Sequence, residues 1–379
     1  MTFFVKRDEV QPSAKHYKDM PLSQRGRAGM DILGSMQVFS SSTLRDTWKD
    51  RFEANPEVAE LDQMDTSGMD RASLRDRLVR GRTIAESDQY YRLERFIQRY
   101  VAEENFNRGI PSVEEKRDMF ATFGAPPSGE PKGSLDLNEA YQAPAYTTTE
   151  WHLEPGGWDG YDLYPAMFAH AVGPRVFARG GYAYAMVGED IRKHRMFFVD
   201  QFPRSSYERI VELGCGACTT LMTVGRAYPD AELAGYDTSP TLLKTGHSSA
   251  ELQGMKIDLK RESADDVSEP DNNCDLVYSY ALHHEIPNSV SEKVLREAFR
   301  ILKPGGDFIM SDLPPFRAVP SFNGVLMDWE SAHRGEPFFT QAALMDLDQT
   351  MRDIGFVDVE SYGMGEHAYP WITKGRKPE

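Results

Sequence analysis

The sequence is poor in cysteine, and its acidic residues outnumber its basic ones. Of 379 residues only three are cysteine, and two of these, Cys215 and Cys218, lie close together. Three cysteines cannot form a disulfide framework, so we expect a reducing compartment, the cytoplasm. Lys and Arg number 43 against 59 Asp and Glu, which gives a formal net charge of −16. Because contacts with phosphate need a basic face, this charge argues against nucleic acid as the main partner.

Long apolar runs are also missing. No stretch approaches the length of a membrane span, and the first residues, M-T-F-F-V-K-R-D, lack the apolar core of a signal peptide. No residues have the spacing of a metal site, so we expect no metal, unless scattered carboxylates assemble one. The composition, 40% hydrophobic and 27% charged, is that of a soluble globular protein. A chain of 379 residues suits two domains, or one domain with a large cap.

The rest of the chain is organised around the stretch from Glu208 to Thr220, E-R-I-V-E-L-G-C-G-A-C-T-T. Its short apolar run ends in Gly214-x-Gly216 and small residues, which predicts a buried parallel strand, a tight turn and the start of a helix. Glycine lets the backbone bend sharply and lets a ligand approach without a Cβ in the way. Exposed N–H groups at the start of the helix then face an acceptor-rich ligand. The stretch therefore predicts a site for a nucleotide-type cofactor.

Three cofactor types compete for this turn. A dinucleotide fingerprint needs G-x-G-x-x-G, and Thr219 occupies its third glycine position. A thioredoxin-type redox pair would use Cys215 and Cys218, which also lie between a strand and a helix. S-adenosylmethionine (SAM) has no phosphate but carries an ammonium group, and Glu212 suits a cation better than an anionic pyrophosphate. These residues favour SAM over a dinucleotide, a redox pair or a turn that binds nothing.

The pattern divides the chain into three parts. Residues 1–40 are polar with several prolines and glycines, and predict an irregular arm. Residues 41–204 carry mostly helical patterns, and predict a cap that covers the substrate or forms a dimer. Residues 205–379 alternate strand and helix patterns, as a doubly wound parallel sheet requires. We expect the cofactor in this third part.

The helix signals of the N-terminal half are local. Ser42 is a candidate N-cap, and the clearest helix is predicted from Thr83 to Asn107, where apolar residues recur at three- and four-residue steps. Ser112 followed by Glu115 predicts the capping box of another short helix. No catalytic constellation is present among these helices.

Aromatic residues are concentrated after a proline- and glycine-rich break at 124–133. At this density they form either a domain interface or the wall of a pocket for a flat apolar molecule. They are Tyr141, Tyr146, Trp151, Trp158, Tyr161, Tyr164 and Phe168, followed by Tyr182 and Tyr184.

An acidic residue follows the second predicted strand. This strand runs from Ala231 to Tyr236 and ends at Asp237, about 20 residues after the glycine turn, where a carboxylate can accept hydrogen bonds from both hydroxyls of a ribose. The alternative is that Asp237 caps the helix that begins near Pro240. Three further strands are predicted at 256–261, 275–280 and 306–312, helices at 289–302 and 340–354, and a long functional loop or lid at 313–337.

The motifs of this region resemble those of the class I SAM-dependent methyltransferases, particularly the small-molecule branch that includes the ubiquinone/menaquinone-biosynthesis methyltransferases. They occur in the family's order over about residues 205–374. The resemblance implies a Rossmann-like, doubly wound α/β sheet of seven strands with an antiparallel last strand, beside the mostly helical N-terminal domain. The matching segments are V-E-L-G-C-G-A-C-T-T, G-Y-D-T-S-P, E-S-A-D-D, C-D-L-V-Y-S-Y-A-L-H-H, L-R-E-A-F-R-I-L-K-P-G-G and I-G-F-V-D-V-E.

The resemblance also implies which residues bind the cofactor. Cys218 stands where the family often has a third glycine, and the family's adenine-binding aspartate aligns with either Asp265 or Ser263. The implied contacts are Glu212, Gly214 and Gly216 to the methionine portion, Asp237 to the ribose, Ala264 and Asp265 to the adenine, and Tyr280 beside the cofactor.

The catalytic candidates follow the fourth strand. Small-molecule O-methyltransferases with a helical dimerisation domain have a similar layout, and in them a histidine after the fourth or fifth strand deprotonates the acceptor. His283 falls at such a position, with His284 and Glu285 adjacent, and a histidine pKa lies near working pH. The alternative is that this segment only packs the corner between strand and helix. His333 is a weaker candidate in the predicted loop.

These observations predict a cytoplasmic methyltransferase that acts on a small, aromatic or apolar acceptor, with O-methylation favoured over C- or N-methylation. A homodimer would suit the helical N-terminal region. Two alternatives stay open: a non-catalytic SAM-binding scaffold or regulatory protein, and an enzyme that uses the SAM fold for other chemistry.

Overall fold

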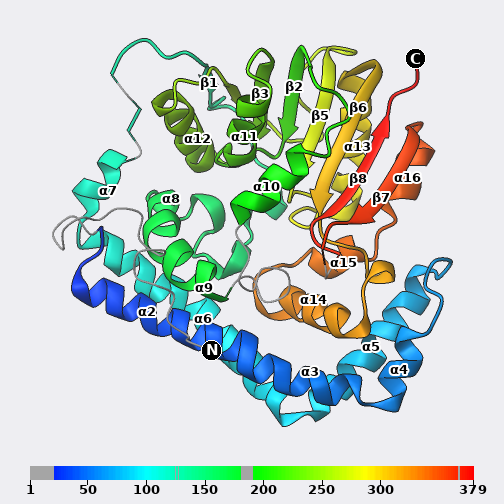
Figure 1. Cartoon of the computed structure of the whole chain (residues 1–379). Coiled ribbons are helices and arrows are strands. Elements are labelled where there is room, and N and C mark those ends of the chain that lie inside the picture. Colours follow the sequence, from blue (N-terminus) through cyan, green and yellow to red (C-terminus); the bar gives the residue numbers. More distant parts are fainter. Residues whose placement is uncertain (1–20, 124, 127, 181–190, 366–367) are drawn as a thin grey trace.

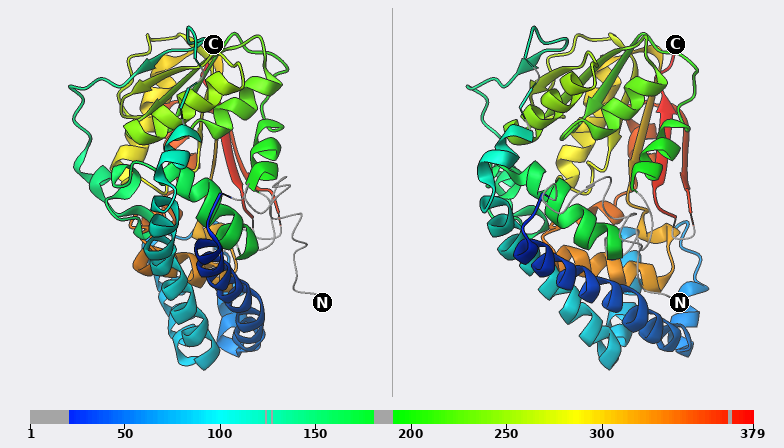
Figure 2. Two further views of the ribbon diagram at one scale, coloured as in Figure 1. Left: turned by 90° about the vertical axis from the view of Figure 1, so that its left-hand side faces the viewer. Right: turned by 60° about the vertical axis from the view of Figure 1, so that its left-hand side comes forward.

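The structure of the protein is a computed structural model that describes residues 21–379 except 124, 127, 181–190 and 366–367. The first twenty residues of the predicted arm, and the aromatic residues Tyr182 and Tyr184, lie outside the described residues. A sheet flanked by helices forms one half of the molecule, and a layer of helices forms the other (Figure 1). Figure 2 shows the long N-terminal helices beneath the sheet from two further directions. Within the described ranges, no helix is long and apolar enough to cross a membrane.

Eight strands form one sheet in the order β1-β4-β3-β2-β5-β6-β8-β7. Neighbouring strands are parallel except β8, which runs antiparallel to both β6 and β7. This confirms the predicted Rossmann-like α/β sheet with an antiparallel last strand. The strands are β1 (Leu135–Asp136), β2 (Arg209–Leu213), β3 (Glu232–Asp237), β4 (Asp258–Arg261), β5 (Cys274–Tyr280), β6 (Leu302–Asp312), β7 (Val357–Gly363) and β8 (Trp371–Arg376).

The sheet has one strand more than the seven predicted. The additional strand, β1, comes from the segment before residue 205 and pairs in parallel with β4, Leu135 opposite Leu259. Two residues are too few for any periodic signal, so the sequence alone could not indicate this strand.

Alternate residues of the central strands face opposite sides of the sheet, as the pleat requires. Ile210 and Leu276 belong to the core on the side of α11 and α12, whereas Val211 and Val277 belong to the core on the side of α13 and α16. Buried on both faces, these strands read as continuous apolar runs. The flanking helices are α10 (Ile191–Val199), α11 (Thr219–Ala227), α12 (Pro240–Leu252), α13 (Asn288–Ile301) and α16 (Leu347–Ile354).

The N-terminal half is mostly helical, as predicted, but the predicted irregular arm is wrong where the structure describes it. Residues 24–39 form α2, and the side chain of Ser23 caps it by accepting a hydrogen bond from the N–H of Gly26. The helices are α2 (Gln24–Phe39), α3 (Arg45–Glu53), α4 (Pro56–Asp62), α5 (Arg71–Ser87), α6 (Gln89–Glu114), α7 (Arg117–Phe123), α8 (Tyr164–Met167) and α9 (Ala178–Gly180), with π-helical turns at Ser40–Leu44 and Phe168–Phe177 and 3₁₀ turns at Ala145–Thr148, Trp151–Leu153 and Gly157–Asp159.

Three local helix predictions in this half are also wrong. Ser42 lies within a continuous helical run and its hydroxyl donates to the carbonyl of Val38, so it caps nothing. Asp88 divides the predicted Thr83–Asn107 helix, because its carboxylate caps α6. Ser112 lies inside α6 instead of at the start of a new helix. In each case a polar residue suited to a cap has more than one local hydrogen-bonding option.

A buried ion cluster joins these helices. Glu94 of α6 is 0% exposed and accepts hydrogen bonds from Arg45 of α3, at 2.8 Å, and from its neighbour Arg95, at 2.6 Å. Removal of one member of such a cluster leaves uncompensated buried charge, so we expect it to be important for stability.

The predicted loop at 313–337 is wrong as well, because most of it is helical. After a 3₁₀ turn at Phe316–Ala318, residues Ser321–His333 form α14, which packs against α5 and shares a core with Trp48 and Leu78. Three of the four prolines that suggested a loop precede the helix, and Pro337 follows it. The predicted final helix is likewise divided into α15 (Phe339–Ala343) and α16, which is capped by Asp346. The segment 313–344 therefore belongs to the helical layer although it lies between β6 and β7 in the sequence.

Candidate functional site

A cavity of about 560 Å³ lies between the carboxyl ends of β2, β3 and β5 and the helical layer. Open α/β sheets bind ligands at this edge, and the volume is in the range of small-molecule sites. One part of its wall comes from the sheet loops, another from aromatic residues, and a third from ionisable residues. They include Glu212, Gly214, Gly216, Asp237, Ser263, Ala264 and Tyr280; Tyr146, Trp151, Trp158, Tyr164, Phe168 and Phe339; and His152, His284, Glu285 and Glu336.

The glycine turn has the predicted tight geometry. Gly214 has a φ of +73°, and a Cβ there would lie 2.7 Å from the side chain of Leu282. The N–H groups of Gly214 and Cys215 both donate to the carbonyl of Tyr236, which ties the turn to β3. Cys218 has a φ of +59° and immediately precedes α11. The residue that departs from the family pattern thus adopts the left-handed conformation that glycine would adopt at lower energy.

Asp237 lies at the end of β3 and is hydrogen-bonded by the backbone on both sides. Its Oδ2 accepts from the N–H of Gly216 at 2.8 Å, and its Oδ1 accepts from the N–H of Ser239 at 2.9 Å. Burial raises the pKa of Asp237 above its usual range. Each carboxylate oxygen has a further lone pair, so the pair of oxygens can still accept bonds from a diol in the cavity.

Glu212 lies on β2, where its side chain is buried. The hydroxyl of Tyr278 donates to its Oε2 at 2.9 Å, and burial raises the pKa of Glu212 to about 8. A carboxyl group with this pKa gains most from a cationic ligand, which would favour its charged form.

Of the two predicted adenine-binding residues, Ala264 and Asp265, only one lines the cavity. Ala264 lines the cavity, together with Ser263. Asp265 is absent from the cavity lining, and its Oδ1 accepts a hydrogen bond from the hydroxyl of Ser263. Tyr280 lines the cavity at the end of β5, with the guanidinium of Arg195 5.4 Å from its ring centre.

The three catalytic candidates differ in whether they line the cavity. The ring of His283 is buried outside the cavity lining, without a hydrogen-bond partner among the described residues, and burial lowers its pKa to about 4. His284 and Glu285 do line the cavity. His284 lies 2.7 Å from Asp312 through Nδ1 and 3.5 Å from Glu285 through Nε2. Burial alone would lower the pKa of His284, but these two carboxylates raise it well above its usual value.

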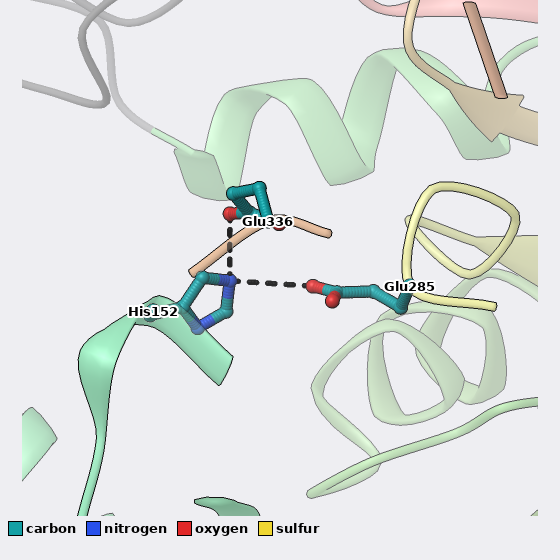
Figure 3. A group of neighbouring side chains, drawn as sticks. All are labelled: His152, Glu285 and Glu336. Carbon is teal, nitrogen blue, oxygen red and sulfur yellow. Dashed lines mark ion pairs between the residues drawn. The ribbon is translucent and has the colours of Figure 1, made fainter. Parts of the chain in front are cut away.

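Sequence reasoning missed further ionisable residues at this end of the cavity. The Nε2 of His152 lies 3.0 Å from an oxygen of Glu336 and 3.3 Å from an oxygen of Glu285 (Figure 3). Its Nδ1 lies 3.6 Å from Glu154. His152 has a φ of +53°. Its backbone N–H donates to the carbonyl of Gly335, and this hydrogen bond holds His152 beside the segment that carries Glu336. No motif spans these residues, because they come from three distant parts of the chain.

Comparisons with known proteins match part of the chain. Residues 210–306 match the family described as a methyltransferase domain. A demethylmenaquinone methyltransferase of Thermus thermophilus is 29% identical over 129 residues, 34% of this chain and 57% of that protein. A ubiquinone biosynthesis O-methyltransferase of Ruegeria pomeroyi is 27% identical over 169 residues, 43% of this chain and 65% of that protein. The solved apo structure of the SAM-dependent methyltransferase SibL has a TM-score of 0.44 at 18% identity, over 56% of this chain and 62% of that one.

The family match begins in β2 and includes the glycine turn and Asp237. The chain carries a class I SAM-dependent methyltransferase domain. The chain spans less than two thirds of the length of these two curated relatives.

The cysteines of this methyltransferase domain do not have the properties of a redox pair. The sulfurs of Cys215 and Cys218 lie 3.9 Å apart, and both residues are buried. Burial raises the pKa of Cys215 well above its usual value. Redox-active cysteines instead have a lowered pKa and an accessible thiolate.

Five of the aromatic residues upstream of the methyltransferase domain form part of the cavity wall, which is one of the two roles predicted for them, whereas Tyr141 and Tyr161 are absent from the lining. The five are Tyr146, Trp151, Trp158, Tyr164 and Phe168. Trp158 lies edge-on to both His152 and Tyr164, with ring centres 4.9 and 5.9 Å apart. His333 is absent from the cavity lining and lies against Trp329 in α14.

Proposed function

We propose that this protein transfers the methyl group of SAM to a small aromatic or apolar acceptor, with an oxygen as the favoured nucleophile. One observation carries the proposal: the motif residues of the methyltransferase domain and the aromatic residues of the N-terminal half line the same cavity. Such a cavity has room for a cofactor at one end and a second molecule at the other.

In this proposal the sheet loops hold the cofactor. Glu212 faces the ammonium group, the turn at Gly214 and Gly216 lets the methionine portion approach, and Asp237 accepts the ribose hydroxyls. Ala264 contacts the adenine through its backbone, and the hydrogen-bonded Asp265 supports that loop. Tyr280 lies beside the cofactor. The donor is already activated by its sulfonium charge, so the protein contributes mainly alignment and exclusion of water.

The acceptor would lie against the aromatic wall, because planar apolar molecules bury much area there. Its hydroxyl would lie beside Glu285, which contacts His284. Burial alone would raise the pKa of Glu285, but the neighbouring histidines hold that pKa well below its usual value. This carboxylate would therefore orient the hydroxyl by accepting a hydrogen bond, and the proton would pass to water. His283 has its ring outside the cavity lining, and we assign it a packing role. A homodimer, a cytoplasmic location and the lack of a nucleic-acid partner stay predictions.

Calorimetric titration with SAM and with S-adenosylhomocysteine tests the cofactor assignment. We expect both to bind saturably, and Asp237→Asn to weaken binding at least tenfold, because it loses charge-assisted hydrogen bonds worth about 1.5–3 kcal/mol each. Asp230→Asn, an exposed matched change in the turn before β3, should leave affinity unchanged. Absence of binding to the wild-type protein would refute the proposal.

A screen for S-adenosylhomocysteine formation with phenols, quinols, carboxylic acids and amines then tests the transfer itself. Turnover with a phenol or quinol is the expected result. Tight cofactor binding without turnover on any acceptor class would favour the scaffold alternative.

A further inference from the structure

The ionisable end of the cavity brings together more carboxyl groups than basic side chains. Four carboxylates, from Glu154, Glu285, Glu336 and Asp312, surround two imidazoles. Buried carboxyl groups need partners, so this arrangement favours a cation beside them.

The same carboxylates have oxygens without partners. Glu154 and Glu336 are each 3% exposed, and one oxygen of each has no hydrogen-bond donor among the described residues. The second oxygen of Glu285 is likewise without a partner in the described part of the chain. A buried acceptor without a donor costs about 1–3 kcal/mol, and more when it is charged. Two of these carboxylates, Glu285 and Glu336, meet at the Nε2 of His152, and a ligand bound beside that nitrogen would pair with their oxygens.

The geometry points to a divalent metal ion bound by His152, Glu285 and Glu336. Their ligand atoms all lie within 4.8 Å of one another, and the three side chains converge from three separate segments (Figure 3). Ligands about 2.1 Å from a metal are separated by roughly 3.0 Å in octahedral and 3.4 Å in tetrahedral geometry. The Nε2 of His152 lies 3.0 and 3.3 Å from the two carboxylate oxygens.

The chemistry of these ligands limits the metal. One imidazole nitrogen with two carboxylates suits Mn²⁺, Fe²⁺ or Zn²⁺, whereas a site for Mg²⁺ or Ca²⁺ would be built from oxygens alone. Two ligand carboxylates also neutralise the charge of a divalent ion. His284, which Asp312 holds through Nδ1, contacts Glu285 through Nε2. Outer partners of metal ligands commonly make such contacts.

All three ligands line the cavity, so the metal would have coordination positions open toward the acceptor. This part of the inference rests on the proposed function. The acceptor would bind the metal through a phenol or enol oxygen, and the metal would lower the pKa of that hydroxyl. The acceptor class is then an oxygen-bearing aromatic or enolic molecule. Glu285 would act as a metal ligand, and the proton of the acceptor hydroxyl would pass to water as the acceptor binds.

The test measures metal binding directly, on the full chain freed of metal by a chelator. Calorimetric titration with MnCl₂ and with ZnCl₂ should show one saturable equivalent for the wild-type protein, and binding should raise the Tm. Glu336→Gln and Glu285→Gln should each weaken binding at least tenfold, because loss even of an outer partner has an effect of that size. Glu292→Gln changes an exposed carboxylate of α13 and should bind as the wild type does.

A wild-type protein that binds neither ion saturably would overturn the inference, and His152 would then be a protonated partner of the two carboxylates. Unchanged affinity in both ligand variants would overturn it as well. SAM titration of the same samples checks that each variant is folded. If the wild-type protein binds metal but not SAM, the metal site stands and the proposed function fails, so the two failures are distinguishable.

Discussion

The buried carboxyl group of Glu212 gives a prediction that connects stability with cofactor binding. Its side chain lies on the central strand β2 and is 2% exposed, with one hydrogen bond from Tyr278. Burial raises its pKa to about 8 from 4.5. In Glu212→Gln an amide of nearly the same shape can still accept that hydrogen bond but cannot become charged.

The sign of the effect follows from where the proton is bound. Between pH 4.5 and about 8 the folded wild-type protein keeps a proton that the unfolded chain has lost, so its free energy of unfolding falls as the pH rises. The slope is on the order of 1 kcal/mol per pH unit. From pH 6 to pH 8 the wild type should therefore lose roughly 2–3 kcal/mol relative to Glu212→Gln. Above about pH 8 the two proteins should diverge no further, because Glu212 is then charged in both states.

Equilibrium unfolding in urea at pH 6, 7, 8 and 9, without cofactor, measures this difference. Glu292→Gln, an exposed carboxylate on α13, should show the same pH dependence as the wild type. Parallel stability curves for the wild type and Glu212→Gln would refute the reasoning, because they would mean that Glu212 is charged in the folded state throughout. SAM should also bind Glu212→Gln about tenfold more weakly or worse, since the ammonium group loses its charged partner.

Three further changes test the stability and chemistry of other parts of the chain. Glu94→Ala should lower the free energy of unfolding by about 3–5 kcal/mol in urea titrations, because it leaves two arginines buried without their carboxylate; a change below 1 kcal/mol would show that the cluster is effectively solvated. Gly214→Ala should lower stability by about 2 kcal/mol, owing to the positive φ and a steric overlap, whereas Gly68→Ala, with open space around it, should have little effect. Exchange of both Cys215 and Cys218 for Ala should leave SAM binding within a factor of about three by calorimetry, since both thiols are buried and their shared role is packing; loss of binding only under oxidising conditions in the wild type would restore the redox interpretation.

The sheet and the part of the cavity wall formed by its loops could be predicted because their information is local. In β2 and the glycine turn, the apolar run, the acidic residue and the two glycines are adjacent in sequence, and the backbone itself forms the site. Asp237 was predictable for the same reason, as it follows directly on an apolar strand. The polar residues at the ends of buried strands follow directly on short apolar runs, so the sequence pattern alone indicates them.

The errors fall where long-range packing overrides local signals. The prolines before α14 and the polar residues near α2 suggested irregular chain, yet both segments bury a face against distant helices and so become helical. Ser42 and Ser112 have the chemistry of caps, but the helix continues through them because its tertiary contacts favour it.

The sequence by itself determined the type of sheet, the glycine turn and most of the motif residues that line the cavity, because strand periodicity and turn chemistry act over a few neighbouring residues. Only the tertiary structure decided which ionisable groups meet at the acceptor end. It buried His283 outside the cavity lining and brought His152 and Glu336, from segments far apart in the chain, to Glu285. Such a convergence depends on how the helical layer packs over the sheet, and no local pattern encodes that packing.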